Sequence, residues 1–153
     1  MAQPGKMSIR EWEASKEGRF YKLISNTIND FLLAEAAERL LDRLGDVKRD
    51  FPLALDLGCR TGLLAARLGR PPNKPGQVGR LVQCDLSEPM VRAARAAHPG
   101  PVPAAPILVA DEEALPFADG AFDLILSSLA LHWVNDLPGT LAQIRRALKP
   151  DGL

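Results

Sequence analysis

Apolar residues along this chain follow two alternating patterns, which predict helices and strands in turn. From Ile24 to Leu44 they recur mostly at three- and four-residue spacing, as in an amphipathic helix, and Gly45 supplies a stop. The run Phe51–Leu57 is short, apolar and followed by turn residues, which suits a buried parallel strand. Further strands are predicted over residues 81–85, 106–110 and 122–126, and further helices over residues 63–68, 87–98 and 137–148.

The predicted helices carry signals at their ends. Ser87 and Asp136 stand where a cap residue belongs, and Pro150 with Gly152 closes the last helix. That helix has one apolar face, formed by Leu137, Leu141, Ile144 and Leu148. Residues 70–76 are rich in proline and glycine and form a loop by composition.

The order of these elements predicts the architecture. Strands that alternate with helices are the signature of an α/β fold, here a Rossmann-like doubly wound sheet. Its helices cover both faces, and a ligand binds at the carboxyl ends of the strands, near the point where the strand order reverses. We divide the chain into residues 1–50, a polar segment plus the amphipathic helix, and residues 51–153, the sheet domain.

Composition narrows the class of protein. The 153 residues suit one domain with one sizeable core, and 46% hydrophobic with 25% charged residues is ordinary for a globular protein. With 19 basic and 19 acidic residues the net charge is zero, which argues against a nucleic-acid partner.

Signals for export or membrane insertion are missing from the sequence. No run approaches the roughly 18 apolar residues that span a bilayer. The first twenty residues mix basic and acidic side chains, unlike a secretory or transit peptide. Cys59 and Cys84 are too few for a disulfide scaffold and are interpreted as reduced thiols, and no metal site is expected. These features favour a cytoplasmic location.

The first candidate for chemistry is the loop that follows the strand Phe51–Leu57. Its sequence, Asp56-Leu57-Gly58-Cys59-Arg60-Thr61-Gly62, places two glycines before a helix, so that the backbone can approach a ligand with its amide groups. A tight turn without a ligand is the alternative.

Two further acidic residues follow the next two strands. Asp85 stands where nucleotide-binding α/β folds use a carboxylate to accept hydrogen bonds from ribose hydroxyls, and helix capping before Ser87 is the alternative. Asp111 is a candidate acceptor for the exocyclic amine of adenine. An exposed loop position is the alternative for Asp111 and the favoured interpretation for the side chains of Glu112 and Glu113.

Together these motifs resemble the class I S-adenosylmethionine-dependent methyltransferases over residues 51–153. The resemblance rests on residues 56–62, Asp85, residues 110–117 and residues 122–128. Residues 51–59 and 127–138 are more closely similar to the methyltransferase-like assembly factors of respiratory complex I and their bacterial relatives. The malonyl-carrier-protein methyltransferases of biotin synthesis are similar at a greater distance.

The resemblance implies a cofactor, S-adenosylmethionine, and a set of residues around it. Asp56, Gly58 and Gly62 would line its methionine part, Asp85 would hold the ribose, and Asp111 with the backbone of Glu112 would hold the adenine. Ser127 to Leu129 would lie beneath the reactive centre, and His132 and Trp133 would border the acceptor pocket. The predicted cofactor-binding residues are Asp56, Gly58, Cys59, Arg60, Gly62, Asp85, Leu86, Asp111, Glu112 and Ser127.

Arg60 and His132 each carry a further expectation. The family usually has glycine where this chain has Arg60; an arginine could swing out, pair with the carboxylate of the cofactor, or weaken binding, and weaker binding is the favoured outcome. His132 is the candidate catalytic residue, as a general base for a hydroxyl or nitrogen acceptor, although a pocket-wall role is favoured.

Three functions remain open. The first is a methyltransferase that acts on a small-molecule, carrier-bound or protein acceptor. The second is an assembly factor of the same fold, which works by partner binding or by protein arginine hydroxylation linked to the same cofactor, and which in a eukaryote would be mitochondrial. The third and least favoured is an NAD-dependent dehydrogenase, because the loop Gly58-x-x-x-Gly62 departs from G-x-G-x-x-G.

The end of the chain carries one more expectation. Four strands are predicted, whereas the resembled fold has seven, and a fifth would begin near Leu153. We therefore expect a truncated product that holds most cofactor contacts but lacks much of the half that determines the substrate; an inactive fragment is the alternative to an active enzyme. The fourth strand would leave an apolar edge open, which favours a homodimer through that edge.

Overall fold

The computed structural model describes residues 16–68, 78–97 and 106–153. Two units separate between residues 34 and 35, and each is described by itself. The predicted polar segment before residue 16 and the loop at 70–76 lie outside the described residues. The predicted division of the chain into residues 1–50 and 51–153 stays a prediction.

The longest helix, α2, runs from Lys16 to Gly45 and crosses the boundary between the units. It ends at the predicted glycine but begins eight residues before Ile24 (24 − 16), where the apolar spacing starts. In the first unit, Phe31 and Leu32 of this helix are exposed. In the second unit, Ala37 and Leu44 are buried against the sheet, so this part of α2 belongs to the core. Among the described helices, none combines the length and apolarity that crossing a bilayer requires.

The second unit is built on a four-stranded sheet with the order β3-β2-β1-β4. The strands are β1 (Phe51–Leu57), β2 (Val78–Asp85), β3 (Ile107–Val109) and β4 (Leu124–Leu126). All pairings are parallel, and Ala54 at the centre of β1 lies opposite Leu81 on one side and Leu124 on the other. Because β2 and β4 flank β1, the strand order reverses at β1, which confirms the predicted doubly wound sheet.

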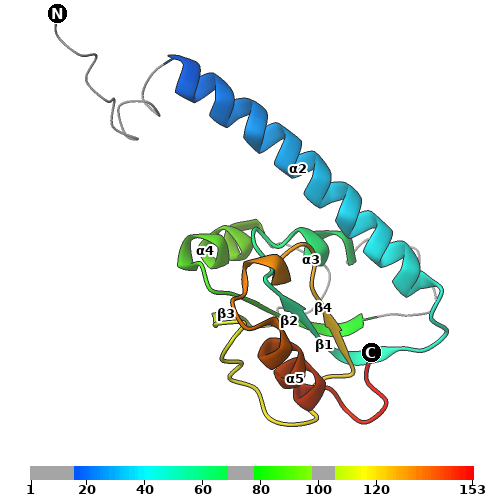
Figure 1. Cartoon of the computed structure of the whole chain (residues 1–153). Coiled ribbons are helices and arrows are strands. Elements are labelled where there is room, and N and C mark those ends of the chain that lie inside the picture. Colours follow the sequence, from blue (N-terminus) through cyan, green and yellow to red (C-terminus); the bar gives the residue numbers. More distant parts are fainter. Residues whose placement is uncertain (1–15, 69–77, 98–105) are drawn as a thin grey trace, which may run out of the picture. The chain divides into compact units, whose positions relative to one another are not determined.

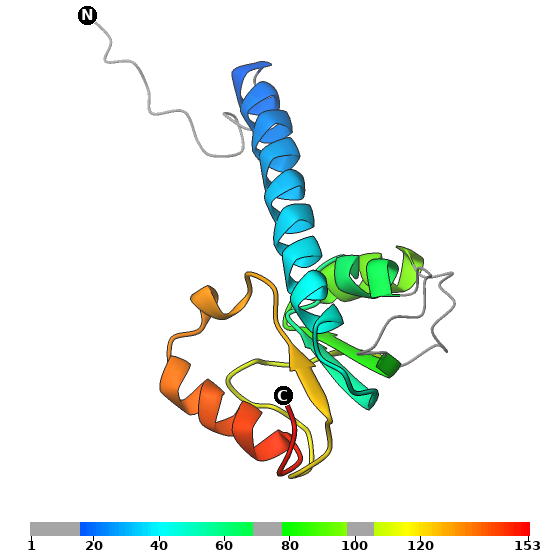
Figure 2. The same ribbon diagram turned by 90° about the vertical axis from the view of Figure 1, so that its right-hand side faces the viewer.

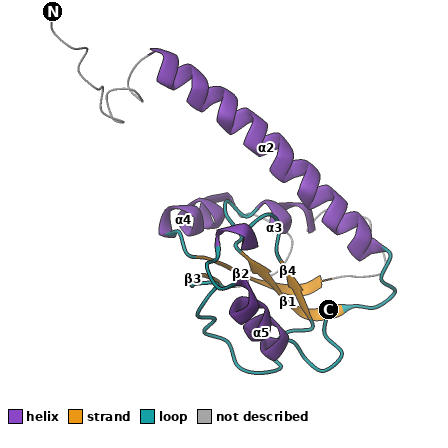
Figure 3. Cartoon of the chain, viewed as in Figure 1, coloured by secondary structure: helices purple, strands orange, loops and turns teal. Residues whose placement is uncertain are grey.

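Helices cover both faces of this sheet (Figure 2). They are α3 (Leu63–Leu68), α4 (Glu88–Ala97) and α5 (Leu137–Ala147). Figure 1 shows α5 on the opposite side of the strands from α3 and α4, and Figure 3 shows the same layers by type of element. Alternate residues of β1 enter different cores: Ala54 packs in the cluster with α3, whereas Leu55 packs in the cluster with Ala147 of α5. This burial on both faces explains why β1 reads as a continuous apolar run.

Several element ends differ from the predictions. The strand β2 begins at Val78 rather than Leu81, and β3 and β4 are shorter than their apolar runs. At Phe122 the backbone pairs with Leu148 instead of continuing β4. Asp136 caps α5 as predicted, since its Oδ1 accepts from the amide of Gly139 at 2.9 Å.

The apolar face predicted for α5 is only partly the buried one. Leu137 and Leu141 are exposed by 42% and 48%, whereas Thr140 and Ala147 are buried. The helix is therefore turned so that its smaller residues approach the sheet.

The outer edge of β4 is not open along its length, contrary to the prediction. The amide of Leu153 donates to the carbonyl of Asp123 at 3.1 Å, and the carbonyl of Leu153 accepts from the amide of Ile125 at 2.9 Å. This is the pattern of a parallel ladder. Because the chain turns back after α5, its own last residue occupies the edge. The homodimer through this edge stays a prediction.

Candidate functional site

The loops after β1, β2, β3 and β4 meet at the carboxyl edge of the sheet. In the first of them, the amides of Gly58 and Cys59 both donate to the carbonyl of Cys84 at 2.9 Å, which ties the loop to the end of β2. Gly58 has a φ of 71°, and a Cβ built there would overlap the Cβ of Ala130 in the loop after β4. Only glycine allows this approach, so the residue joins the two loops closely.

Asp85 connects the loops at the end of β2. Its side chain is buried, its Oδ2 accepts from the amide of Arg60 at 2.9 Å, and its Oδ1 accepts from the amide of Ser87 at 2.8 Å. The bond to Ser87 forms a turn directly before α4 and involves none of the helix's own amides, so the predicted alternative, a capping role, stays a prediction. This bond does not exclude the binding role, because each carboxylate oxygen can accept more than one hydrogen bond.

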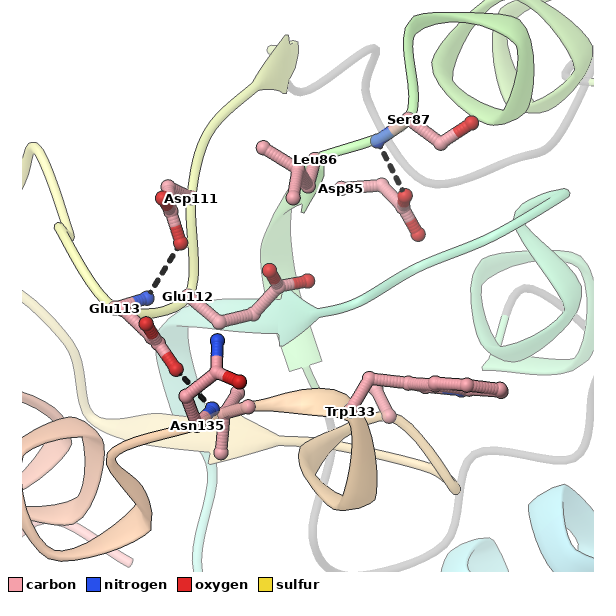
Figure 4. Close-up of a pocket in the computed structure, with 10 residues that line it drawn as sticks. Asp85, Leu86, Ser87, Asp111, Glu112, Glu113, Trp133 and Asn135 are labelled. Atoms are coloured by element: carbon pink, nitrogen blue, oxygen red, sulfur yellow. Dashed lines mark hydrogen bonds between the residues drawn. The ribbon is translucent and has the colours of Figure 1, made fainter.

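A cavity of about 340 Å³ opens beside Asp85 (Figure 4). Its walls come from the loops after β2, β3 and β4 and consist of Asp85, Leu86, Ser87, Asp111, Glu112, Glu113, Ala130, Trp133, Val134 and Asn135. Four predicted cofactor-binding residues, Asp85, Leu86, Asp111 and Glu112, thus share one cavity. Figure 4 shows the carboxylate of Glu112 lying between Asp85 and Asn135.

The other predicted site residues lie around this cavity rather than in its wall. Asp56, Gly58, Cys59, Arg60 and Gly62 belong to the end of β1 and its loop. The hydroxyl of Ser127 donates to the carbonyl of Leu57 at 2.9 Å and so braces β4 against β1. His132 lies in the short 3-10 helix η1 (Leu131–Trp133), where it is exposed, and its ring centroid is 4.9 Å from that of Trp133. The catalytic role of His132 stays a prediction.

Two residues that organise the cavity were not predicted as such. Glu113 accepts hydrogen bonds through Oε1 from the amides of Asn135 and Asp136, which joins the loop after β3 to the start of α5. Gln143 of α5 donates to the carbonyl of Glu113 at 2.7 Å and accepts from the amide of Leu115 at 2.9 Å. These contacts fix the rotation of α5. The only sequence signal was a polar residue between Thr140 and Ala147 at helical spacing.

Arg60 takes up an unusual backbone conformation for an arginine. Its φ is 50°, in the region that favours glycine, and Leu129 in the loop after β4 has a φ of 51°. The two residues are joined directly, because Nη2 of Arg60 donates to the carbonyl of Leu129 at 2.6 Å. Of the outcomes expected for Arg60, the side chain does not swing out here but bonds to the loop after β4, whereas pairing with the carboxylate of the cofactor and weaker binding stay predictions.

Burial governs the acidity of the groups at the sheet edge. Asp56 is 1% exposed, and its contact with Nε2 of Gln83 at 3.4 Å is long. Burial, with a smaller contribution from the charge of Asp85, raises the pKa of Asp56 to about 7. Burial also raises the pKa of Glu112, and it raises the pKa of both free thiols, Cys59 and Cys84. These cysteines therefore behave as apolar core groups rather than as nucleophiles.

Comparison with known proteins assigns the family. Residues 55–153 match the family model described as "Methyltransferase domain". The chain belongs to the methyltransferase-domain family. This domain shares 47% identity over 124 residues with the mitochondrial arginine-hydroxylase NDUFAF5 of Mus musculus, covering 81% of this chain and 34% of that protein. It shares 36% identity over 117 residues with malonyl-[acyl-carrier protein] O-methyltransferase 1 of Coxiella burnetii, covering 76% of this chain and 37% of that protein.

Solved structures of methyltransferases have the same fold. One is a complex between the Haloferax volcanii Trm112 methyltransferase activator and a methyltransferase. The TM-score is 0.68 and the identity 30%, and the match covers 92% of this chain and 55% of the matched chain. Another is an S-adenosylmethionine-dependent methyltransferase from Mesorhizobium loti. The TM-score is 0.61 and the identity 31%, and the match covers 76% of this chain and 50% of the matched chain. The chain spans about a third of the length of the curated relatives named above.

No metal centre is found in the described part of this methyltransferase domain: no three histidine, cysteine, aspartate or glutamate side chains lie close enough to share an ion. What the described edge offers a ligand is hydrogen-bond acceptors and negative charge, from Asp85, Asp111 and Glu112.

The buried carboxyl of Asp56 predicts a pH dependence of stability for this methyltransferase domain. Its pKa is 3.8 ordinarily and about 7 when folded, so between these values the folded chain keeps a proton that the unfolded chain has lost. The contribution of this group to the free energy of unfolding is therefore fully present below pH 3.8. It is lost as the pH rises toward about 7, by at most about 1.4 kcal/mol per pH unit. Asp56→Asn cannot ionise, so the variant should gain stability over the parent between about pH 4 and about pH 7.

Urea unfolding followed by circular dichroism at several pH values measures this gain. The matched control is Asp42→Asn, because Asp42 is an exposed carboxylate on α2. We expect the control to follow the parent at every pH. A stability profile of Asp56→Asn that runs parallel to that of the parent would show that Asp56 is ionised in the folded chain.

Proposed function

We propose that this chain binds S-adenosylmethionine at the carboxyl edge of its sheet and forms the cofactor-binding part of a methyltransferase. The observation that carries the proposal is that the carboxylates of Asp85 and Asp111 line one cavity together with Leu86 and Glu112. A nucleoside needs this combination of acceptors and apolar surface, and the cavity of about 340 Å³ is within the ordinary size range for small-molecule sites.

The residues of the cavity fit the parts of an adenosyl group. Asp85 is the acceptor for the ribose hydroxyls, and Asp111 with the backbone of Glu112 is the acceptor and donor pair for the adenine edge. Leu86 and Ala130 supply apolar surface for the purine. The predicted contacts of Asp56, Gly58, Cys59, Arg60 and Gly62 with the methionine part, and of Ser127 beneath the reactive centre, belong to the same proposal.

The charge of the site suits the reactive end of this cofactor. S-adenosylmethionine supplies a methyl group on a positively charged sulfur, and the carboxylates of Asp85 and Asp111 in the cavity favour a cation at this edge. The tasks of the chain itself are to align the cofactor and to exclude water, with Trp133 as one wall of the cavity. His132 is the base for an acceptor that must lose a proton. The acceptor is a small molecule, a carrier-bound acid or a protein.

A second function is favoured by one specific finding, the 47% identity with a mitochondrial arginine-hydroxylase. On that alternative the same cavity holds the cofactor while the whole protein acts in assembly, by contacting a partner or by hydroxylating an arginine. The location would then be mitochondrial rather than cytoplasmic. The two reactions are distinguishable by mass spectrometry of the modified acceptor, since a methyl group and an oxygen atom add different masses. The dehydrogenase alternative gains no support from the family match.

Isothermal titration calorimetry of the 153-residue chain with S-adenosylmethionine tests the proposal, with NADH as the control ligand. We expect saturable binding of S-adenosylmethionine and no binding of NADH, because the cavity has acceptors for one nucleoside. If the folded chain takes up neither ligand, the cofactor proposal fails, and a role through partner contacts alone is left. If the chain prefers NADH, the dehydrogenase alternative replaces the cofactor proposal.

A further inference from the structure

Arg60 connects three of the loops that form the carboxyl edge of the sheet. It lies in the loop after β1, its amide donates to Oδ2 of Asp85 at 2.9 Å, and its guanidinium donates to the carbonyl of Leu129 at 2.6 Å. The side chain therefore crosses from the loop after β1 to the loop after β4. Its position is held by the carboxylate that we assign to the ribose.

The surroundings of Arg60 are acidic. Asp85 ends β2 and bonds to the backbone of Arg60, and a Cβ at Gly58, two residues before Arg60, would lie 3.5 Å from Oε1 of Glu112. Such an edge stabilises positively charged groups and disfavours a carboxylate. A ligand that carries both kinds of charge therefore needs a cation from the protein at its anionic end, and Arg60 brings one to this edge.

The carbonyl of Leu129, the partner of Arg60, satisfies only part of the hydrogen-bonding capacity of a guanidinium. A carbonyl of one loop residue satisfies a single N–H group, whereas a carboxylate accepts two parallel hydrogen bonds in the geometry that arginine prefers. The conformation is also strained, since both Arg60 and Leu129 have positive φ values. Strain of this kind persists mostly where a function requires the geometry.

We propose that Arg60 is the specificity-determining residue for the amino-acid end of the cofactor. Its guanidinium exchanges the carbonyl of Leu129 for the α-carboxylate of the ligand, so the site selects adenosyl compounds that keep this carboxylate. The inference rests on the proposed function. Of the outcomes expected from the sequence, it takes up the pairing with the carboxylate in place of the favoured one, weaker binding.

Two ligands that differ only in the carboxylate test the proposal. S-adenosylmethionine and decarboxylated S-adenosylmethionine are titrated into the parent chain, into Arg60→Gln, and into the control Arg67→Gln, whose arginine contacts Glu38 on α2 at 3.4 Å. A charge-assisted pair predicts that the parent prefers the carboxylated ligand by roughly 10- to 100-fold. We expect Arg67→Gln to keep this preference and Arg60→Gln to lose it, with its affinity for the decarboxylated ligand nearly unchanged.

Further outcomes separate the two proposals. Arg60→Lys keeps the positive charge but lacks the planar guanidinium, so its preference for the carboxylated ligand should be intermediate. An intermediate value in this variant shows that the loss in Arg60→Gln is not a folding defect. Equal preference in the parent and in Arg60→Gln overturns the role of Arg60 while the cofactor site stands. Tighter binding of both ligands by Arg60→Gln shows that the arginine only obstructs the site. If the parent binds neither ligand, both proposals fail.

Discussion

Replacing Asp85 with asparagine is expected to lower the affinity for S-adenosylmethionine by roughly 100-fold or more, a loss of about 3 kcal/mol from two charge-assisted hydrogen bonds. The carboxylate is the proposed acceptor for the ribose hydroxyls. It also accepts from the amides of Arg60 and Ser87 in the chain itself. An asparagine carries one acceptor oxygen and one donor group, so one of these amides would face a donor and the loop after β1 would lose an anchor.

Calorimetric titration measures this loss, and thermal unfolding of the same samples separates it from a change in stability. The control is Asp119→Asn, because Asp119 forms an exposed ion pair with Arg146 at 2.9 Å, outside the cavity. It should bind the cofactor as the parent does. Unaltered affinity of a folded Asp85→Asn variant would mean that the ribose is held elsewhere.

Gly58→Ala is expected to destabilise the chain by about 2–5 kcal/mol and to abolish cofactor binding. The residue has a φ of 71°, which costs a non-glycine residue about 1–2 kcal/mol. The added methyl group would in addition overlap the Cβ of Ala130, and relieving such overpacking costs about 1–3 kcal/mol. The loops after β1 and β4 would have to separate, which moves both walls of the site.

Gly120→Ala is the matched control for this prediction. Gly120 has a similar φ of 64°, but a Cβ there has nothing within 4 Å. The control should therefore carry only the conformational cost, and urea unfolding of the two variants gives the difference directly. Equal losses of stability would show that the close approach of Gly58 to Ala130 does not exist in solution.

The parts of the fold that follow from local pattern were predictable. The strand β1 and the helix α3 have the predicted limits because each is a short apolar run bounded by turn residues. Gly45 ends α2 and Asp136 caps α5 because both act on their immediate neighbours in the chain. Placing Asp85 and Asp111 at one edge needed only the rule that parallel strands end together.

The parts that depend on distant residues were not predictable. The rotation of α5 is set by Gln143, which bonds to backbone groups 28 and 30 residues away in the chain. The sequence favours an exposed position for Glu113, because nothing local indicates its bonds to the amides of residues 135 and 136. Likewise, the contact of Arg60 with Leu129 spans 69 residues. Side-chain hydrogen bonds between loops do not follow a regular spacing along the chain, so the pattern of apolar and polar residues does not predict them.

The most direct test of the cofactor site is a map of where the ligand binds. Amide NMR spectra of the isotopically labelled 153-residue chain, titrated with S-adenosylhomocysteine, report this residue by residue. We expect the largest shifts on residues 85–87 and 111–113, and small shifts on α5 around Arg145, near the separate hollow beside Pro150. Shifts centred on that hollow, or none at saturating ligand, would contradict this expectation.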